Sequence, residues 1–183
     1  MTSQYSLYDV DMRQGTAVQK GKVTKELITQ VVSELVGEEA LSIVFYLQGK
    51  TRISEFIIAE ELEIEINRTR HLLYKLLEHN IVQFLRKKDK IKGWYICYWD
   101  FNESMVPHLA QKMRLAKIQK LRERLENEQR NTFYMCKNAC LRMNFDKSIE
   151  FNFLCPECSG LMHEQDNSRT IEVIRQKIAE LEK

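Results

Sequence analysis

Two close pairs of cysteines constrain the fold of this chain more than any other feature of its sequence. Four of the five cysteines fall within 23 residues, as two pairs joined by a 14-residue spacer. Thiolates separated by two or three residues can bind one metal ion from a tight turn, and a second pair brought back by a hairpin completes a tetrahedral site. We therefore predict a zinc ribbon over residues 132–165, with one Zn²⁺ bound by Cys136, Cys140, Cys155 and Cys158.

The predicted metal is structural. A ribbon of this length cannot bury a core large enough to fold without it, and four cysteines leave no position for a catalytic water. Apolar residues that mostly alternate with polar ones predict hairpin strands around the metal; they are Phe133, Met135, Leu141, Met143, Phe145, Phe151, Phe153 and Leu154.

Other readings of the cysteines remain open from the residues alone. Cys155-x-x-Cys158 also has the spacing of a redox motif, although no βαβ pattern surrounds it. His163 is an alternative ligand in place of one cysteine. Cys97 lies far from the cluster in a strand-like run, where a small buried apolar residue is expected.

Residues 22–104 predict a winged helix-turn-helix domain, after a lead-in over residues 1–21 that shows no apolar period. Helical spacing runs from a Thr24 cap to Gly37, and again from there to Gly49. Ser54 and Asn67 are expected to cap the next two helices, over residues 54–62 and 68–79. Two β-rich runs then surround a charged tip and form the wing; they span residues 81–86 and 94–99.

The second half predicts a long helix, the ribbon and a terminal helix, so the fold class is mainly α with a small β component. Residues 105–131 contain no glycine and carry a narrow apolar stripe, which suits a spacer arm or a coiled-coil partner. Residues 168–183 are expected to form an amphipathic helix.

The sequence shows no sign of catalysis or of a membrane span. It has no glycine-rich phosphate loop and no nucleophile elbow, and its four histidines are dispersed. No apolar run approaches the length of a bilayer, and the first 21 residues lack a signal-peptide pattern. We expect a non-enzymatic cytoplasmic protein whose thiols stay reduced.

Charge is partitioned along the winged-helix region. Residues 38–63 carry a net charge of −4 and residues 64–99 one of +5. Lysines at a hairpin tip can contact phosphates, and aromatic residues beside them can stack on unpaired bases; a solvated wing or a protein-docking wing is equally consistent with the composition. The candidate nucleic-acid or polymerase contacts are Arg68, Arg70, Arg86, Lys87, Lys88, Lys90, Lys92, Trp94 and Tyr95.

Taken in order, these modules resemble archaeal transcription factor E, the counterpart of the α subunit of TFIIE, over about residues 22–183. The resemblance rests on the order of modules and on four runs: Gly93-Trp-Tyr-Ile-Cys-Tyr-Trp99, Thr132-Phe-Tyr-Met-Cys136, Leu141-Arg-Met-Asn-Phe145 and Phe153-Leu-Cys-Pro-Glu-Cys158. The chain departs from the family in its first knuckle, where Ala139 stands at the usual second cysteine and Cys140 at the usual glycine.

The resemblance implies a general transcription initiation factor. Such factors bind RNA polymerase on its clamp and stalk subunits, act with TBP and TFB, and help to melt promoter DNA near the non-template strand. In some lineages they pair with a β subunit. By position, Lys87, Lys88, Trp94 and Tyr95 would face the clamp or that strand. Two alternatives stay open: a sequence-specific winged-helix regulator with a structural zinc, and an assembly adaptor that never contacts DNA.

Overall fold

The structure is a computed structural model that describes residues 23–88 and 93–183. The predicted lead-in over residues 1–21 and the wing-tip residues Lys90 and Lys92 lie outside the described residues. Contacts divide the chain into two compact units, with the boundary between Ala110 and Gln111. Each unit is described by itself below.

The first unit begins with two helices that supply much of its core. Helix α1 (Lys25–Leu35) starts at Thr24, whose hydroxyl accepts a hydrogen bond from the backbone N–H of Leu27, as predicted. Gly37, at φ 114°, ends that segment in a conformation that favours glycine. A 3-10 turn (Glu38–Ala40) then leads into α2 (Leu41–Leu47), which buries Ile43, Val44 and Leu47.

The helix-turn-helix pair is α3 (Glu55–Glu61) and α4 (Ile66–Glu78). Ser54 caps α3 as predicted, by accepting from the N–H of Ile57. The prediction that Asn67 caps α4 is wrong. Glu65 is the cap, and its carboxylate accepts from the N–H of Arg68 at 2.9 Å. A longer acidic side chain makes the same bond and also favours the positive end of the helix dipole.

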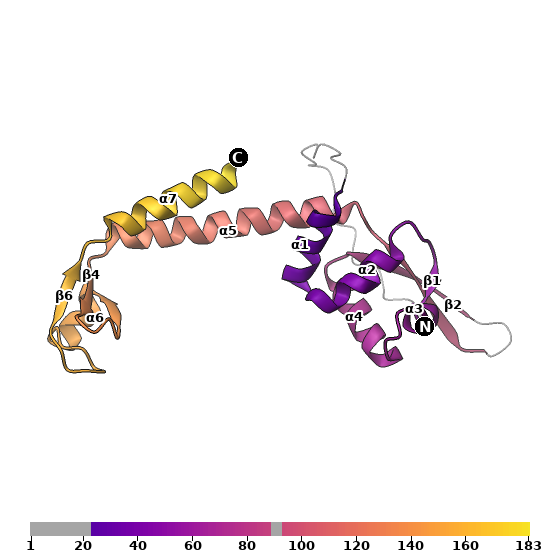
Figure 1. Cartoon of the computed structure of the whole chain (residues 1–183), viewed down its shortest axis with the longest axis horizontal. Helices are drawn as coiled ribbons and strands as arrows, with labels where there is room; N and C mark the ends of the chain where they lie inside the picture. Colours follow the sequence, from indigo (N-terminus) through magenta and orange to yellow (C-terminus); the bar gives the residue numbers. More distant parts are fainter. Residues whose placement is uncertain (1–22, 89–92) are drawn as a thin grey trace, which may run out of the picture. The chain divides into compact units, whose positions relative to one another are not determined.

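Three antiparallel strands form the wing in the order β1-β3-β2 (Figure 1). Strands β2 (Val82–Lys88) and β3 (Tyr95–Phe101) are the predicted hairpin. Strand β1 (Ile53–Ser54) was not predicted, because two residues show no periodicity, yet it pairs Ile53 with Trp99. Four helices followed by this hairpin confirm the winged-helix fold.

Trp99 anchors the first unit. Its side chain is fully buried, with Tyr74 edge-on at 5.8 Å and Phe84 tilted at 5.1 Å between ring centroids. An aromatic side chain buries more apolar area than any aliphatic one, so this position stabilises the packing of α4 against the sheet. The tryptophan therefore belongs to the core and is unavailable for base stacking.

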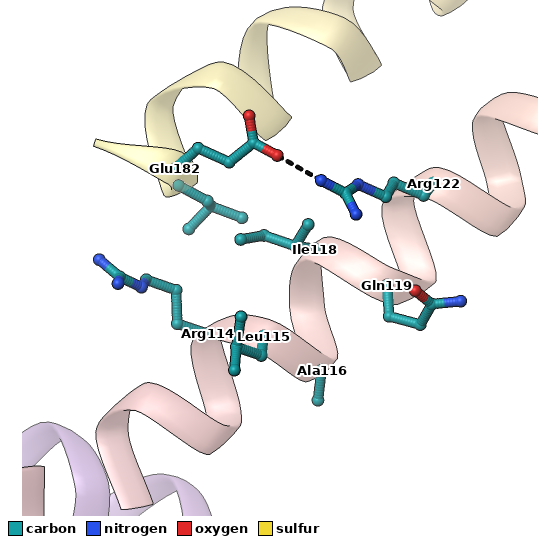
Figure 2. A pocket seen from close by; sticks show the side chains of 8 residues that line it. Arg114, Leu115, Ala116, Ile118, Gln119, Arg122 and Glu182 are labelled. Atoms are coloured by element: carbon teal, nitrogen blue, oxygen red, sulfur yellow. Dashed lines mark hydrogen bonds and ion pairs between the residues drawn. The ribbon is translucent and has the colours of Figure 1, made fainter. Parts of the chain in front are cut away.

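The second unit contains an antiparallel helix pair. Helix α5 (Met105–Arg130) crosses the boundary between the units, and within the second unit it runs beside α7 (Ser168–Glu182) (Figure 1). Ile118 of α5 packs with Ile174 and Ile178 of α7, so the narrow apolar stripe finds its partner within the chain. Figure 2 shows the end of this pair, where Arg122 and Glu182 form an ion pair at 2.6 Å.

A small sheet in the order β5-β4-β6 forms the ribbon. Its strands are β4 (Phe133–Cys136), β5 (Arg142–Asn144) and β6 (Met162–Gln165), and they confirm the predicted hairpin around the cysteines. The strand prediction fails at Leu141, Phe151, Phe153 and Leu154, which lie outside the three strands. It also fails at Phe145, where α6 (Phe145–Glu150) begins under an Asn144 cap. An asparagine cap followed by Asp146 in the first turn favours a helix locally, and this outweighs the alternation.

Among the described residues, no helix is both long and apolar enough to cross a bilayer.

Candidate metal centre and wing surface

The four predicted ligands come together at one end of the ribbon. The sulfur atoms of Cys136, Cys140, Cys155 and Cys158 all lie within 4.8 Å of one another. A tetrahedron with Zn–S bonds of ~2.3 Å has sulfur separations of about 3.8 Å, so a small inward movement completes it. His163 is not part of this cluster: it lies exposed on β6, paired with Met135. The donor set is therefore four sulfur atoms, which suits zinc.

The first knuckle is a tight turn that aims a backbone N–H at sulfur. Ala139 donates its N–H to the carbonyl of Cys136 at 2.9 Å, and Cys140 donates its own N–H to Cys136 Sγ at 3.4 Å. The turn places Ala139 at φ 52°, in the left-handed region. An alanine there is strained by about 1–2 kcal/mol relative to its usual conformation. Cys140 thus follows directly after a strained residue.

The second knuckle is closed by a short backbone bond. Ser159, at φ 55°, donates its N–H to the carbonyl of Cys155 at 2.7 Å, and Cys155 donates to the carbonyl of Gly160. A Cβ on Gly160 would lie 3.3 Å from Cys158 Sγ, which is tighter than ordinary contact. Because Gly160 has no side chain, the sulfur of Cys158 can occupy this space.

The thiols differ strongly in acidity. The N–H bond from Cys140, helped by thiol hydrogen bonds, lowers the pKa of Cys136 to about 6. Hydrogen bonds to Cys158 and Cys136 raise the pKa of Cys140 to about 12. The negative charge is therefore on the buried sulfur of Cys136, and the thiols of the other three cysteines donate hydrogen bonds to it. A divalent cation would replace those shared protons and favour the thiolate form of all four.

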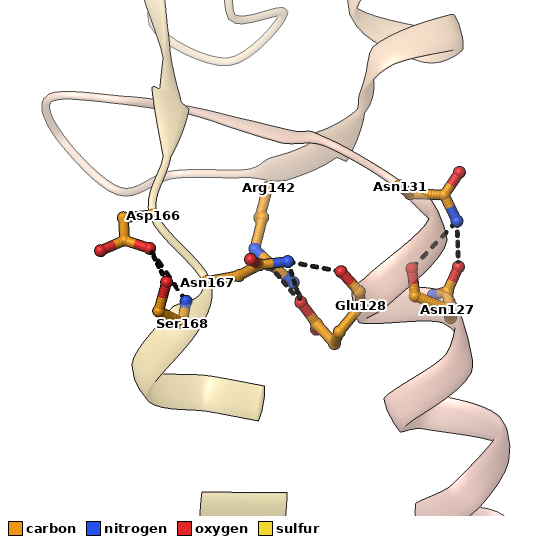
Figure 3. A network of polar contacts seen from close by, with 7 residues as sticks. All are labelled: Asn127, Glu128, Asn131, Arg142, Asp166, Asn167 and Ser168. Atoms are coloured by element: carbon orange, nitrogen blue, oxygen red, sulfur yellow. Dashed lines mark hydrogen bonds and ion pairs between the residues drawn. The ribbon is translucent and has the colours of Figure 1, made fainter. Parts of the chain in front are cut away.

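A bidentate ion pair supports the ribbon from the helix pair (Figure 3). Arg142 of β5 donates to both carboxylate oxygens of Glu128 on α5, at 2.8 and 2.7 Å, and its guanidinium also lies 3.7 Å from the Phe133 ring centre. Asn167, just before α7, donates to the carbonyl of Glu128 at 2.6 Å. Three elements thus meet at one carboxylate.

The network around Glu128 was not among the predicted site residues. One acidic side chain within a helix rich in charged residues carries no signal in the sequence. Its partners lie 14 and 39 residues away, and only the fold brings them together.

The wing exposes aromatic rings beside cations. Trp94 and Tyr95 are 57% and 55% exposed, whereas Trp99 is buried. Arg86 lies 4.4 Å from the Tyr95 ring centre, and Lys87 lies 5.9 Å from that of Tyr98. Because side chains alternate between the two faces of the paired strands, each face of the hairpin places a cation beside a ring. Such a surface suits a partner with both negative charge and flat apolar groups.

The two candidate arginines of α4 take part in ion pairs within the first unit. Arg70 donates from Nε and a terminal nitrogen to one oxygen of Glu55, at 3.0 and 2.8 Å, and Glu55 is only 6% exposed. Arg68 pairs with Glu39, and both of these side chains are largely exposed. Arg70 therefore joins α4 to α3, whereas Arg68 lies on the open surface.

Cys97 is separate from the metal cluster. It lies in β3, opposite Arg86, and burial raises the pKa of its thiol above the usual range. A partly buried protonated thiol in a strand behaves as a small apolar residue.

Comparison with known proteins assigns the family. A family model described as "TFIIE alpha subunit" matches residues 26–130. Three similar proteins, each named Transcription factor E, align along most of this chain. That of Pyrococcus horikoshii is 32% identical over 162 residues, covering 88% of this chain and 84% of the relative.

The other two cover similar shares. The protein from Metallosphaera sedula is 32% identical and covers 86% of this chain and 90% of its own. That from Sulfolobus acidocaldarius is 34% identical and covers 83% and 90%. This chain belongs to the TFIIE α-subunit family and is a general transcription factor of the TFIIE α type.

Proposed function

We propose that this protein binds RNA polymerase through its winged helix and its ribbon and assists the melting of promoter DNA. The winged helix contacts the clamp and the non-template strand near the upstream edge of the bubble, and the ribbon contacts the stalk. The observation that carries the proposal is the pair of exposed aromatic side chains, Trp94 and Tyr95, beside the basic residues of β2.

The physical argument starts from exposure. Large aromatic side chains are enriched at recognition surfaces, because they bury much area with little loss of conformational freedom. Lys88 pairs with Tyr95 across the hairpin, so positive charge lies next to the rings along the strand. An unpaired DNA strand offers phosphates and flat bases together, and a duplex offers no exposed base faces. The wing therefore favours the melted strand over the closed duplex.

Zinc belongs to the same proposal. One Zn²⁺ bound by the four cysteine sulfurs orders the ribbon and supplies its folding energy, as their mutual distances and chemistry support. TBP and TFB act with the protein in the initiation complex, and a β subunit is a further partner in some lineages.

Capture on purified polymerase tests the first half of the proposal. The full chain is incubated with immobilised polymerase, with and without its stalk subunits. We expect retention on the complete enzyme and weaker retention without the stalk. If the chain is retained neither on the complete polymerase nor on the polymerase without its stalk, polymerase binding is refuted.

Permanganate reactivity of promoter thymines tests melting. The double variant Trp94→Ala and Tyr95→Ala should reduce reactivity in complexes that contain polymerase, TBP and TFB. The matched control is Phe56→Ala, since Phe56 is 48% exposed in the same unit and lies off the wing. Equal loss in both variants would show that the wing aromatics have no special role.

Two alternatives predict other outcomes. A photo-crosslinking residue at Trp94 that gives protein adducts alone in the open complex would favour an adaptor without DNA contact. A footprint on naked duplex at low protein concentration would favour a sequence-specific regulator. Against that regulator stands the ion pairing of Arg68 and Arg70, which leaves α4 few free groups to read bases.

A further inference from the structure

One face of α5 carries concentrated positive charge within the second unit. Between residues 111 and 122 the sequence holds five basic side chains and no acidic one. Lys112, Lys117, Lys120 and Arg124 are all exposed, and we call these four the α5 basic face. They lie outside both the wing and the metal cluster.

Helical spacing places Lys112 and Lys120 on the side of α5 that faces away from α7, and Lys117 and Arg124 along the edge between that side and the α7 contact. Lys117, Lys120 and Arg124 follow one another at three- and four-residue steps, and Lys112 lies two four-residue steps before Lys120. Ala116, which lies halfway between Lys112 and Lys120, points away from α7 in Figure 2, whereas Ile118 points toward it. The basic face is therefore uncovered by the helix pair.

The rest of the helix pair shows what an ordinary solvated surface looks like here. Opposite charges and polar partners alternate, as in the Glu126–Arg130 pair and the bond from Gln119 to Glu123. Arg122 is likewise paired, with Glu182. On the basic face, Lys117, Lys120 and Arg124 instead stand three and four residues apart, and like charges at that spacing repel one another. Glu123 and Glu128 offset part of this positive charge at the Arg124 end. A polyanionic partner would remove that repulsion.

The geometry favours duplex nucleic acid as that partner. From Lys112 to Arg124 the helix rises ~18 Å, and a duplex presents one phosphate charge per ~1.7 Å of its axis over that length. The sequence contains no Phe, Tyr or Trp from residue 102 to 132, so this face offers no ring on which an unpaired base could stack. Cations spaced along a helix without aromatic residues suit a regular phosphate backbone and read no sequence.

We propose that the α5 basic face binds the phosphate backbone of duplex DNA, independently of base sequence. The contact is separate from the wing, which we assign to the melted strand. The two surfaces therefore take different forms of the same nucleic acid. The contact involves no base and no aromatic side chain. Its affinity therefore comes from charge and falls as the salt concentration rises.

The test uses the full chain, a labelled 30-base-pair duplex and fluorescence anisotropy over a range of potassium chloride concentrations. The variant carries Lys112→Gln, Lys120→Gln and Arg124→Gln. Lys117 stays in place, because it also interacts within the protein. The matched control carries Arg169→Gln, Arg175→Gln and Lys177→Gln, which removes the same charge from exposed positions on α7.

We expect the α5 variant to lose about tenfold or more in affinity at 100 mM salt, and its salt slope to fall by about 2.7, or ~0.9 per contact. Two duplexes of unrelated sequence should behave alike. The control should change affinity less than about threefold. Circular dichroism should confirm that both variants keep their helix content.

Two results would overturn the proposal. One is equal loss in the variant and the control, which would show that only net charge matters. The other is duplex binding unchanged in the α5 variant while poly-glutamate binding is lost, which would assign this face to an acidic protein. A Lys87→Gln, Lys88→Gln variant measured on single-stranded DNA reports the wing separately, so failure here leaves the proposed role of the wing intact.

Discussion

Arg142 and Glu128 form a two-bond ion pair that joins β5 to α5, with the carboxylate buried and the guanidinium one-third exposed. A bidentate pair fixes both side chains in one geometry, and charged hydrogen bonds of this kind contribute more than neutral ones. The pair therefore couples the folding of the ribbon to the folding of the helix pair within the second unit.

Replacing Glu128 by Ala should destabilise the second unit by about 2 kcal/mol, since it leaves a partly buried guanidinium without its acceptor. Both tryptophans lie in the first unit, so the readout is hydrogen exchange of α7 and β4 amides. Glu126→Ala is the control: its pair with Arg130 is exposed and should contribute less than about 0.5 kcal/mol. Equal effects would show that the buried pair has no special weight.

The same carboxyl predicts a pH dependence. Hydrogen bonds from Arg142 lower the pKa of Glu128 below its usual 4.5, with help from Asn167 and Arg124 and against the effect of burial. A lowered folded-state pKa gives stability that is fully present above the unfolded-state value and is lost as pH falls through the folded one. The stability difference between the native protein and Glu128→Gln should therefore stay constant from pH 8 to about 5.5 and shrink below about pH 4.5.

Only that difference is informative, because acid also protonates the cysteine thiolates in both proteins. Carboxyl carbon chemical shifts measure the pKa of Glu128 directly. A value at or above 4.5 would contradict the assigned hydrogen bonds.

One zinc ion per chain is expected in protein purified without chelators, measured by metal mass spectrometry. Cys155→Ser should abolish it and unfold residues 132–165, because the ribbon has little core beyond the ligands and Met143 and Met162. Tryptophan fluorescence of the first unit should not change. Cys97→Ser is the control and should retain the metal, and a metal-free native protein would refute the site.

We expect the main role of Arg70 to be stabilisation of the first unit. Arg70→Ala leaves the buried carboxylate of Glu55 unpaired and should destabilise the first unit by about 2 kcal/mol, followed by tryptophan fluorescence in urea. Arg68→Ala removes an exposed pair and should cost less than about 0.5 kcal/mol. If Arg70→Ala weakens polymerase or DNA binding without loss of stability, its role is in recognition.

Ala139→Gly should stabilise the zinc-loaded ribbon by about 1 kcal/mol, because glycine adopts the positive φ at this turn without steric strain. Ala116→Gly on the exposed face of α5 should do the opposite, by about 1 kcal/mol, since glycine weakens a helix interior. Thermal unfolding of the second unit compares the two. Destabilisation by Ala139→Gly would show that the turn gains nothing from glycine.

Local signals explain why much of this protein was predictable. Thr24 and Ser54 cap their helices through neighbours three residues away, and the cysteine pairs lie within single turns. Such interactions depend on adjacent residues, so they are visible as spacing. The errors at Asn67 and Phe145 arose where two local signals competed, with a neighbouring cap in one case and an alternating pattern in the other.

By itself, then, the sequence determined the order of modules, most helix ends and the four clustered sulfurs, because each rests on contacts of short range. Only the tertiary structure decided that α7 is the partner of α5, that Trp99 is core while Trp94 is surface, and that Glu128 meets Arg142 and Asn167. These three features depend on which segments pack together when they lie tens of residues apart in the sequence. Burial and pairing are properties of that packing, and no local spacing encodes them.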